Sequence, residues 1–121
     1  MSTEQEQKTA IDMIKAVHDD GVATINGRDY QFSSTTHKKR RKVFAYYSKI
    51  GSVAANGDMS FIDTPEWDAI ETMICEMTLF DGMQLSKLDG HWDKYPQDYI
   101  MFATISMQVI SYPFMQGNAG V

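Results

Sequence analysis

Cysteine, histidine and long apolar runs are scarce in this chain of 121 residues, and each scarcity excludes a class of protein. The single cysteine, Cys75, excludes an intramolecular disulfide and a cysteine-based zinc cluster. The three histidines, His18, His37 and His91, are scattered and do not form a metal site in its place. No apolar run approaches the roughly 18 residues of a membrane span, and residues 1–20 lack the apolar segment of a signal peptide, so we expect a cytoplasmic protein.

Catalytic signatures are also missing. The chain has no Gly-rich phosphate loop, no G-x-S-x-G elbow, no H-E-x-x-H pair and no acidic calcium loop. Two arrangements remain open: Cys75 with His91 as nucleophile and base, and His91 with Asp89 and Asp93 as a weak metal site. We favour an inert thiol and exposed turn residues instead, because one histidine with two carboxylates is a poor ligand set. The sequence therefore predicts no catalytic, cofactor-binding or metal-binding residue and no enzyme activity.

The composition is that of one folded domain. Hydrophobic residues make up 43% of the chain and charged residues 22%, close to globular averages, and the length suits a single core over residues 1–121. The spacing of Ile11, Ile14 and Val17 predicts an N-terminal helix within residues 1–20. Residues 115–121 carry two glycines and no charge, which predicts a flexible tail.

Two segments have the pattern of β-hairpins. Asn26-Gly27 lies between short apolar and polar alternations, and this dipeptide suits a type I′ turn, so we predict a hairpin near residues 22–32. Asp81-Gly82 has a similar setting near residues 78–86. There the pattern leaves open a second short hairpin or a loop between helices.

Three further helices follow from start and stop signals. Residues 36–50 begin after a Ser/Thr run and reach Gly51, which is a typical stop. Thr64-Pro65 is a strong helix start, and residues from Tyr95 onward show a helical period up to Pro113, where we expect that helix to end. The expected fold is α+β and predominantly helical, with about four helices, a small hairpin near 22–32 and the open case near 78–86.

The segment HKKRRK, residues 37–42, is strongly basic in a chain of net charge −5. A cluster of this kind is one signature of a small nucleic-acid-binding regulatory protein. Against that alternative, the rest of the chain is acidic, no nucleic-acid-binding motif accompanies the run, and consecutive charges spread around a helix. We therefore expect no nucleic acid partner and assign Lys38, Lys39, Arg40 and Arg41 to pairing with acidic protein surface, either in this chain or in a partner.

Several segments of the chain resemble a known family. They are a G-R-D-Y-x-F segment starting at Gly27, then T-P-E-W-D-x-I-E, F-D-G-M-Q-L, H-W-D-K-Y-P-x-D-Y and I-S-Y-P-F-M-Q-G-N, in this order. Together they are similar to the tail assembly chaperones of tailed bacteriophages and prophages, over roughly residues 21–119. The matching positions are aromatic, Gly and Pro residues without a catalytic signature, so the resemblance carries over no catalytic residue.

The resemblance implies a non-enzymatic protein of the bacterial host cytoplasm that binds the phage tape measure protein and assists tail tube assembly. It implies the tail tube protein as a further partner, and it leaves open whether the chain forms homo-oligomers. A tape measure protein is a long helical polypeptide, and exposed, adaptable apolar side chains suit such a partner. The chain has nine methionines, and the candidate partner-binding residues are Met101, Tyr112, Phe114 and Met115. A structural tail component that stays in the particle is the other alternative.

Overall fold

The computed structural model describes the backbone of residues 13–119 and the side chains of residues 13–114. Residues 13–20 are helical, in agreement with the end of the predicted N-terminal helix, whose earlier part lies outside the described residues. The elements that follow are β1 (Val22–Ile25), β2 (Arg28–Phe32), α2 (His37–Ala55), η1 (Ser60–Asp63), α3 (Pro65–Glu76), β3 (Thr78–Phe80), β4 (Met83–Gln84), η2 (Leu85–Lys87), α4 (His91–Lys94), η3 (Pro96–Asp98) and α5 (Tyr99–Ala119).

The four strands form one antiparallel sheet in the order β1-β2-β3-β4. Asn26 and Gly27 have φ of 52° and 80°, as a type I′ turn requires, and Asp81 and Gly82 repeat these values. The hairpin near 22–32 is therefore confirmed, and the open case near 78–86 is settled as a second hairpin. The two hairpins join through β2 and β3, where Phe32 pairs with Thr78. The mostly helical α+β fold is confirmed.

Helix α2 is longer than the sequence predicted. Its start is as expected, since the Thr36 side chain accepts a hydrogen bond from the Lys39 amide. Its end is not at Gly51, because the helix passes through this glycine to Ala55. Asn56 and Gly57 supply the stop, with their amides bonded back to carbonyls of the last turn and Gly57 at φ of 88°.

Helix α3 begins as predicted. The Thr64 side chain caps the Trp67 amide, Pro65 occupies the first turn, and acidic residues follow at the positive end of the helix. Trp67 is fully buried, and Ile74 lies further along the same helix with no exposed surface. Cys75, the next residue of α3, is also buried.

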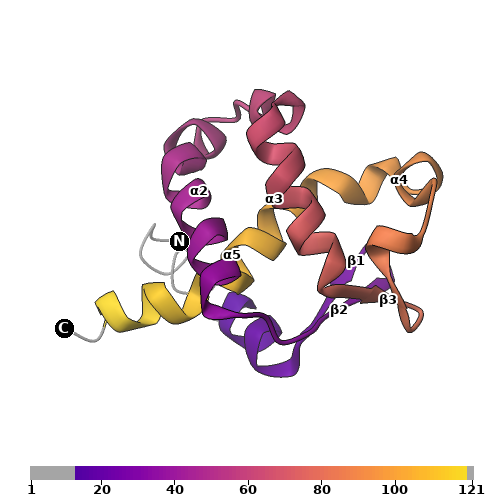
Figure 1. The fold of residues 1–121 in the computed structure, drawn as a ribbon, viewed down its shortest axis with the longest axis horizontal. Coiled ribbons are helices and arrows are strands. Elements are labelled where there is room, and N and C mark those ends of the chain that lie inside the picture. Colours follow the sequence, from indigo (N-terminus) through magenta and orange to yellow (C-terminus); the bar gives the residue numbers. More distant parts are fainter. Residues whose placement is uncertain (1–12, 120–121) are drawn as a thin grey trace, which may run out of the picture.

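Helix α5 runs through the molecule and does not end at Pro113. It continues through the proline to Ala119, so the first part of the segment that we predicted to be a flexible tail is helical. In Figure 1 the helix passes behind α2 and α3, and its C-terminal end projects beyond α2. Its middle section supplies much of the core: Phe102, Ala103, Met107 and Ile110 are all at most 2% exposed.

The helices and the sheet enclose one core. The α2 and α3 pair lies on one side of α5, and α4 and the sheet lie toward the N-terminal end of α5 (Figure 1). The largest fully buried side chains come from every layer: Tyr30 from β2, Val43 from α2, Trp67 from α3 and Phe102 from α5. None of the helices in the part of the chain described here combines the length and apolar character that crossing a membrane requires.

Candidate functional site

A buried polar cluster surrounds Asp98, whose exposed fraction is 0%. The Arg28 guanidinium binds the carboxylate through two bonds, from Nε to Oδ2 at 2.6 Å and from a terminal nitrogen to Oδ1 at 2.7 Å. Asn26 Nδ2 donates to Oδ1 at 2.7 Å, and the Tyr30 hydroxyl donates to Oδ2 at 2.7 Å. A charge at this depth is stable only when it is paired and fully hydrogen-bonded, and both conditions hold here.

The local structure explains why these groups meet. Arg28 and Tyr30 are two residues apart in β2, so their side chains lie on the same face of the sheet. Asn26 is in the turn before them. Asp98 ends the short η3 helix that leads into α5. The first hairpin is thereby tied to the start of α5, some 70 residues away in sequence, as the separation of Arg28 and Asp98 shows.

His91 extends the cluster through Tyr30, with Nε2 2.9 Å from the Tyr30 hydroxyl oxygen. The hydroxyl has one proton, which Asp98 accepts, so the oxygen must accept a hydrogen bond from His91. The neutral imidazole therefore carries its proton on Nε2 and a lone pair on Nδ1. Burial lowers the pKa of His91, which favours this neutral form.

The charges in the cluster are stabilised in their ordinary states. The Arg28 guanidinium holds the pKa of the Asp98 carboxyl well below its usual range, against the opposite effect of burial. The hydrogen bond to Asp98 raises the pKa of Arg28. Burial and then the hydrogen bond to Asp98 raise the pKa of the Tyr30 phenol. No group in this set is poised to exchange a proton near neutral pH, so the cluster resembles a structural clamp more than a catalytic centre.

Aromatic rings close around the clamp. Phe80 from β3 lies 5.2 Å from the Tyr30 ring and 4.6 Å from the His91 ring, measured between centroids. The Arg28 guanidinium lies 4.2 Å from the centre of the Tyr95 ring, a cation–π contact. These residues belong to the segments G-R-D-Y-x-F, F-D-G-M-Q-L and H-W-D-K-Y-P-x-D-Y, so three of the segments that carry the family resemblance meet at one place.

A second polar contact joins α3 to α5. Trp67 Nε1 donates to the Tyr99 hydroxyl at 2.7 Å, and this hydroxyl donates to Glu71 Oε2. Burial, followed by the hydrogen bond to Glu71, raises the pKa of Tyr99. The contact gives the buried indole N–H a partner and fixes the start of α5 against α3.

The structure gives little support to the two chemical arrangements that the sequence left open, a Cys75–His91 nucleophile and base and a metal site at His91. Cys75 and His91 both line a surface pocket of about 440 Å³ beside α3 and α4, together with Asp89 and Asp93. Burial, with Glu71 and Glu76 nearby, raises the pKa of the Cys75 thiol to about 12, so it stays protonated at neutral pH and is a poor nucleophile. Over the described residues, no group of three or more His, Cys, Asp or Glu side chains is placed to hold a metal ion.

The charges of the basic run spread around α2, as expected, and one of them turns toward the interior. Arg40 is half-buried and donates from a terminal nitrogen to the Ile110 carbonyl of α5 at 2.7 Å. Lys39 lines a separate pocket with Glu76 and residues 33–36. Lys38 and Arg41 are exposed, as is Lys42. Of the four basic candidates, Arg40 therefore has a structural contact within the chain.

The apolar candidates for partner binding also differ in their exposure to solvent. Met101 is 47% exposed on α5 and is available to a partner, and Ile100 beside it is 38% exposed. Tyr112 is only 8% exposed and packs on the His18 ring, so it presents little surface. Phe114 is half-buried, 5.2 Å from Phe44 between ring centroids. Met115 lies in α5, but its side chain is outside the described part.

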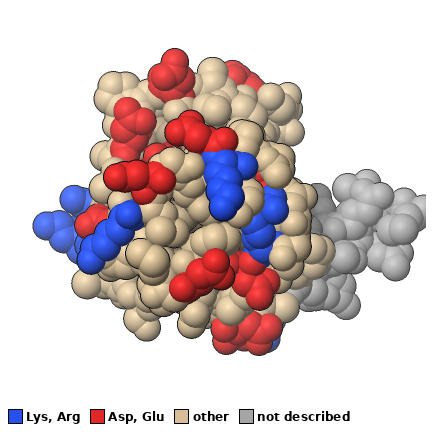
Figure 2. All heavy atoms as spheres, turned by 90° about the vertical axis from the view of Figure 1, so that its right-hand side faces the viewer, with Lys and Arg blue, Asp and Glu red and all other residues tan. Residues whose placement is uncertain are grey.

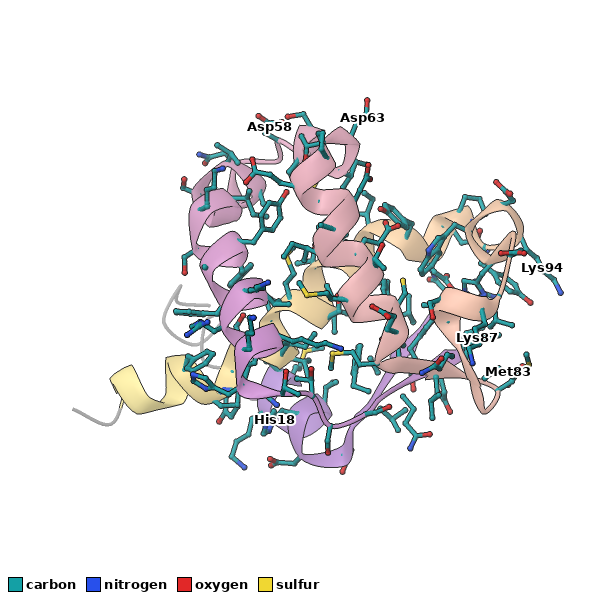
Figure 3. The ribbon with its side chains drawn as sticks, in the orientation of Figure 1. His18, Asp58, Asp63, Met83, Lys87 and Lys94 are labelled. Atoms are coloured by element: carbon teal, nitrogen blue, oxygen red, sulfur yellow. The ribbon has the colours of Figure 1, made fainter. Side chains whose placement is uncertain are left out.

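Charges elsewhere on the surface are mixed. On the side that carries β4, η2 and α4, Lys and Arg side chains alternate with Asp and Glu, and no broad area of one sign forms (Figure 2). Lys87, Lys94 and Met83 lie on this side, whereas Asp58 and Asp63 lie at the end of the α2–α3 pair (Figure 3). The basic residues of α2 are thus separate from Lys87 and Lys94.

Sequence reasoning missed the Asp98 cluster. One signal was present: a charged residue, Arg28, shares a strand face with the apolar-patterned Tyr30 and therefore needs a buried partner. The identity of that partner had no sequence signal, because Asp98 lies in a distant turn.

Comparison of the chain with protein-family models, with curated proteins and with solved structures gives no significant match.

Proposed function

We propose that the protein is a non-enzymatic tail assembly chaperone of a tailed bacteriophage or prophage, which binds the tape measure protein and assists tail tube assembly. The observation that carries the proposal is the meeting of three family-like segments around Asp98. These segments build one clamp, and their shared place in the fold is the support that we take for the proposal.

The proposal of a binding role rests on the surface of α5 and not on the buried ionisable groups. The buried ionisable groups are held in their resting protonation states, and the Cys75 thiol is protonated. The part of the surface that suits a helical apolar partner is on α5, which has no Lys, Arg, Asp or Glu over its whole length and exposes Ile100 and Met101.

Co-expression with the tape measure protein of the same phage genome tests the proposal directly. We expect a larger soluble fraction of that protein and its co-purification with this chain. Met101→Gln should reduce co-purification, because it removes exposed apolar surface from α5. Met83→Gln is the matched control, since Met83 is 53% exposed but belongs to β4.

Two results would contradict the proposal. One is a tape measure protein that stays insoluble and does not co-purify. The other is mass spectrometry of purified particles that finds this chain at stoichiometric levels, since an assembly chaperone leaves the finished tail whereas a structural tail component remains.

A further inference from the structure

The outward side of α2 carries a basic stripe that the fold neutralises only at Lys49, which pairs with Glu66. We define the stripe by Lys38, Arg41 and Lys42, followed on the same face by Ala45, Ser48, Lys49 and Ser52, all exposed. These residues recur at intervals of three and four, so they lie along one face of the helix. The other members of the basic run turn elsewhere, Arg40 to the Ile110 carbonyl and Lys39 to the pocket at the start of the helix.

The three cations at the head of the stripe have no ion-pair partner in the described part of the chain. The lysine and arginine ion pairs found there are Lys15 with Asp19, Arg28 with Asp98 and Lys49 with Glu66. Lys38, Arg41 and Lys42 also lie on adjacent turns near the positive end of the α2 dipole. Both conditions are unfavourable for the isolated helix. An anionic group on a partner would offset both the repulsion among these cations and their unfavourable interaction with the helix dipole. Positions at which the sequence works against local stability in this way are often functional.

We propose that this stripe is a docking surface for an acidic α-helix of a partner protein. Lys38 and Lys49 are separated by about 16 Å along α2, at 1.5 Å per residue, which is about three helical turns. A partner helix with carboxylates at i, i+4, i+7 and i+11 presents charges over the same length. The small Ala45 and Ser48 side chains between the charges allow a second helix to approach closely.

Nucleic acid fits the same surface less well. The stripe has no aromatic side chain on which a base could stack, and the chain as a whole has a net charge of −5. Few phosphate contacts are possible from one short helix face. The inference specifies only the chemistry of the partner and stands apart from the tail assembly proposal.

Fluorescence anisotropy with a labelled Ala-rich peptide that carries Glu at i, i+4, i+7 and i+11 tests the inference on the full chain. A peptide with Gln at these positions and a short DNA duplex are measured beside it. We expect the Glu peptide alone to bind at low ionic strength and to dissociate as salt is added, because exposed ion pairs are screened. Lys38→Gln with Lys42→Gln should weaken binding about tenfold.

The matched control is Lys87→Gln with Lys94→Gln, which removes the same charge from the opposite side of the molecule (Figure 3) and should leave binding unchanged. Circular dichroism should show both double variants folded, since all four lysines are exposed. The inference is overturned if the Glu peptide does not bind at low salt, or if the two double variants weaken binding equally. A duplex bound as tightly as the Glu peptide and weakened by the α2 variant also overturns it, in favour of nucleic acid.

Discussion

Replacement of Asp98 by Asn removes the charge at the centre of the buried cluster and keeps the size of the side chain. The Arg28 guanidinium then faces a side chain with one oxygen instead of two, and the new amide group brings N–H donors toward the donors of Arg28 and Asn26. Removing one member of a buried, hydrogen-bonded charge pair costs about 3 to 5 kcal/mol. The Arg28 side chain is 24% exposed and can partly return to water, so we expect a loss near 3 kcal/mol in the free energy of unfolding, about the lower limit of that range.

The assay is urea denaturation followed by circular dichroism, with the thermal midpoint as a second measure. For a chain of this size the loss corresponds to a decrease of about 10 °C in Tm. Asp89→Asn is the control, because Asp89 is an exposed carboxylate without an ion pair in the described residues, and its change should stay within about 0.5 kcal/mol. If Asp98→Asn also stays within about 1 kcal/mol of the parent protein, the cluster does not hold the hairpin to α5 and our reasoning is wrong.

The pH dependence gives an independent test of the same cluster. The pKa of Asp98 is lower in the folded protein than in the unfolded chain, so the unfolded chain takes up the proton first as the pH falls. The contribution of Asp98 to stability is therefore complete above about pH 5 and decreases below about pH 4. The difference in unfolding free energy between the parent protein and Asp98→Asn should narrow over that acidic range. A difference that stays constant down to about pH 3 would contradict the lowered pKa.

Further predictions concern single contacts. Nitrogen-15 NMR of the histidine rings should show His91 protonated on Nε2 at neutral pH, and protonation on Nδ1 would contradict the hydrogen-bond direction from His91 to Tyr30. Arg40→Met should lower the free energy of unfolding by about 1 kcal/mol because the Ile110 carbonyl loses its donor, whereas Arg41→Met on the exposed face should change it little. Gly82→Ala should destabilise by about 1 to 2 kcal/mol because φ is 80° there, whereas Gly51→Ala should stabilise by about 0.5 to 1 kcal/mol because it lies within α2 with open space around it. These free energies are measured by urea denaturation. Equal effects of the two arginine variants would contradict the role of the Arg40 contact, and equal effects of the two glycine variants would contradict the different backbone conformations of Gly82 and Gly51.

The sequence predicted those elements whose cause is local. Asn26-Gly27 makes a type I′ turn because of its own backbone preferences, and Thr64-Pro65 starts α3 through a side-chain cap and a proline that needs no donor. These features are complete within a few residues, so a single sequence is enough to recognise them. The mostly helical α+β fold follows from several such signals read together.

The sequence did not predict features that depend on contacts between distant segments. Gly51 is a weak stop signal, and α2 passes through it because packing of the helix continues to Ile50 and Ala54 and a stronger stop follows at Asn56-Gly57. Pro113 removes a backbone donor from α5, yet the helix continues while its preceding turn is held against α2 by Arg40. The Asp98 cluster unites residues some 70 positions apart. Helix propensity and turn rules contain no information at that range.

The topology of the sheet has a consequence for how the chain tolerates change in length. The chain leaves the sheet after Phe32, forms α2, η1 and α3, and returns at Thr78, the residue with which Phe32 is paired. The two ends of this helical excursion are therefore already side by side. Residues added at its far turn, around Gly57 and Asp58, lengthen a loop without shifting the register of any strand, and the entropic cost of a longer loop grows slowly. The α2–α3 turn is thus a place where the architecture can accept an inserted segment, whereas an insertion in the turn between β1 and β2 would disturb the bond from Asn26 to Asp98.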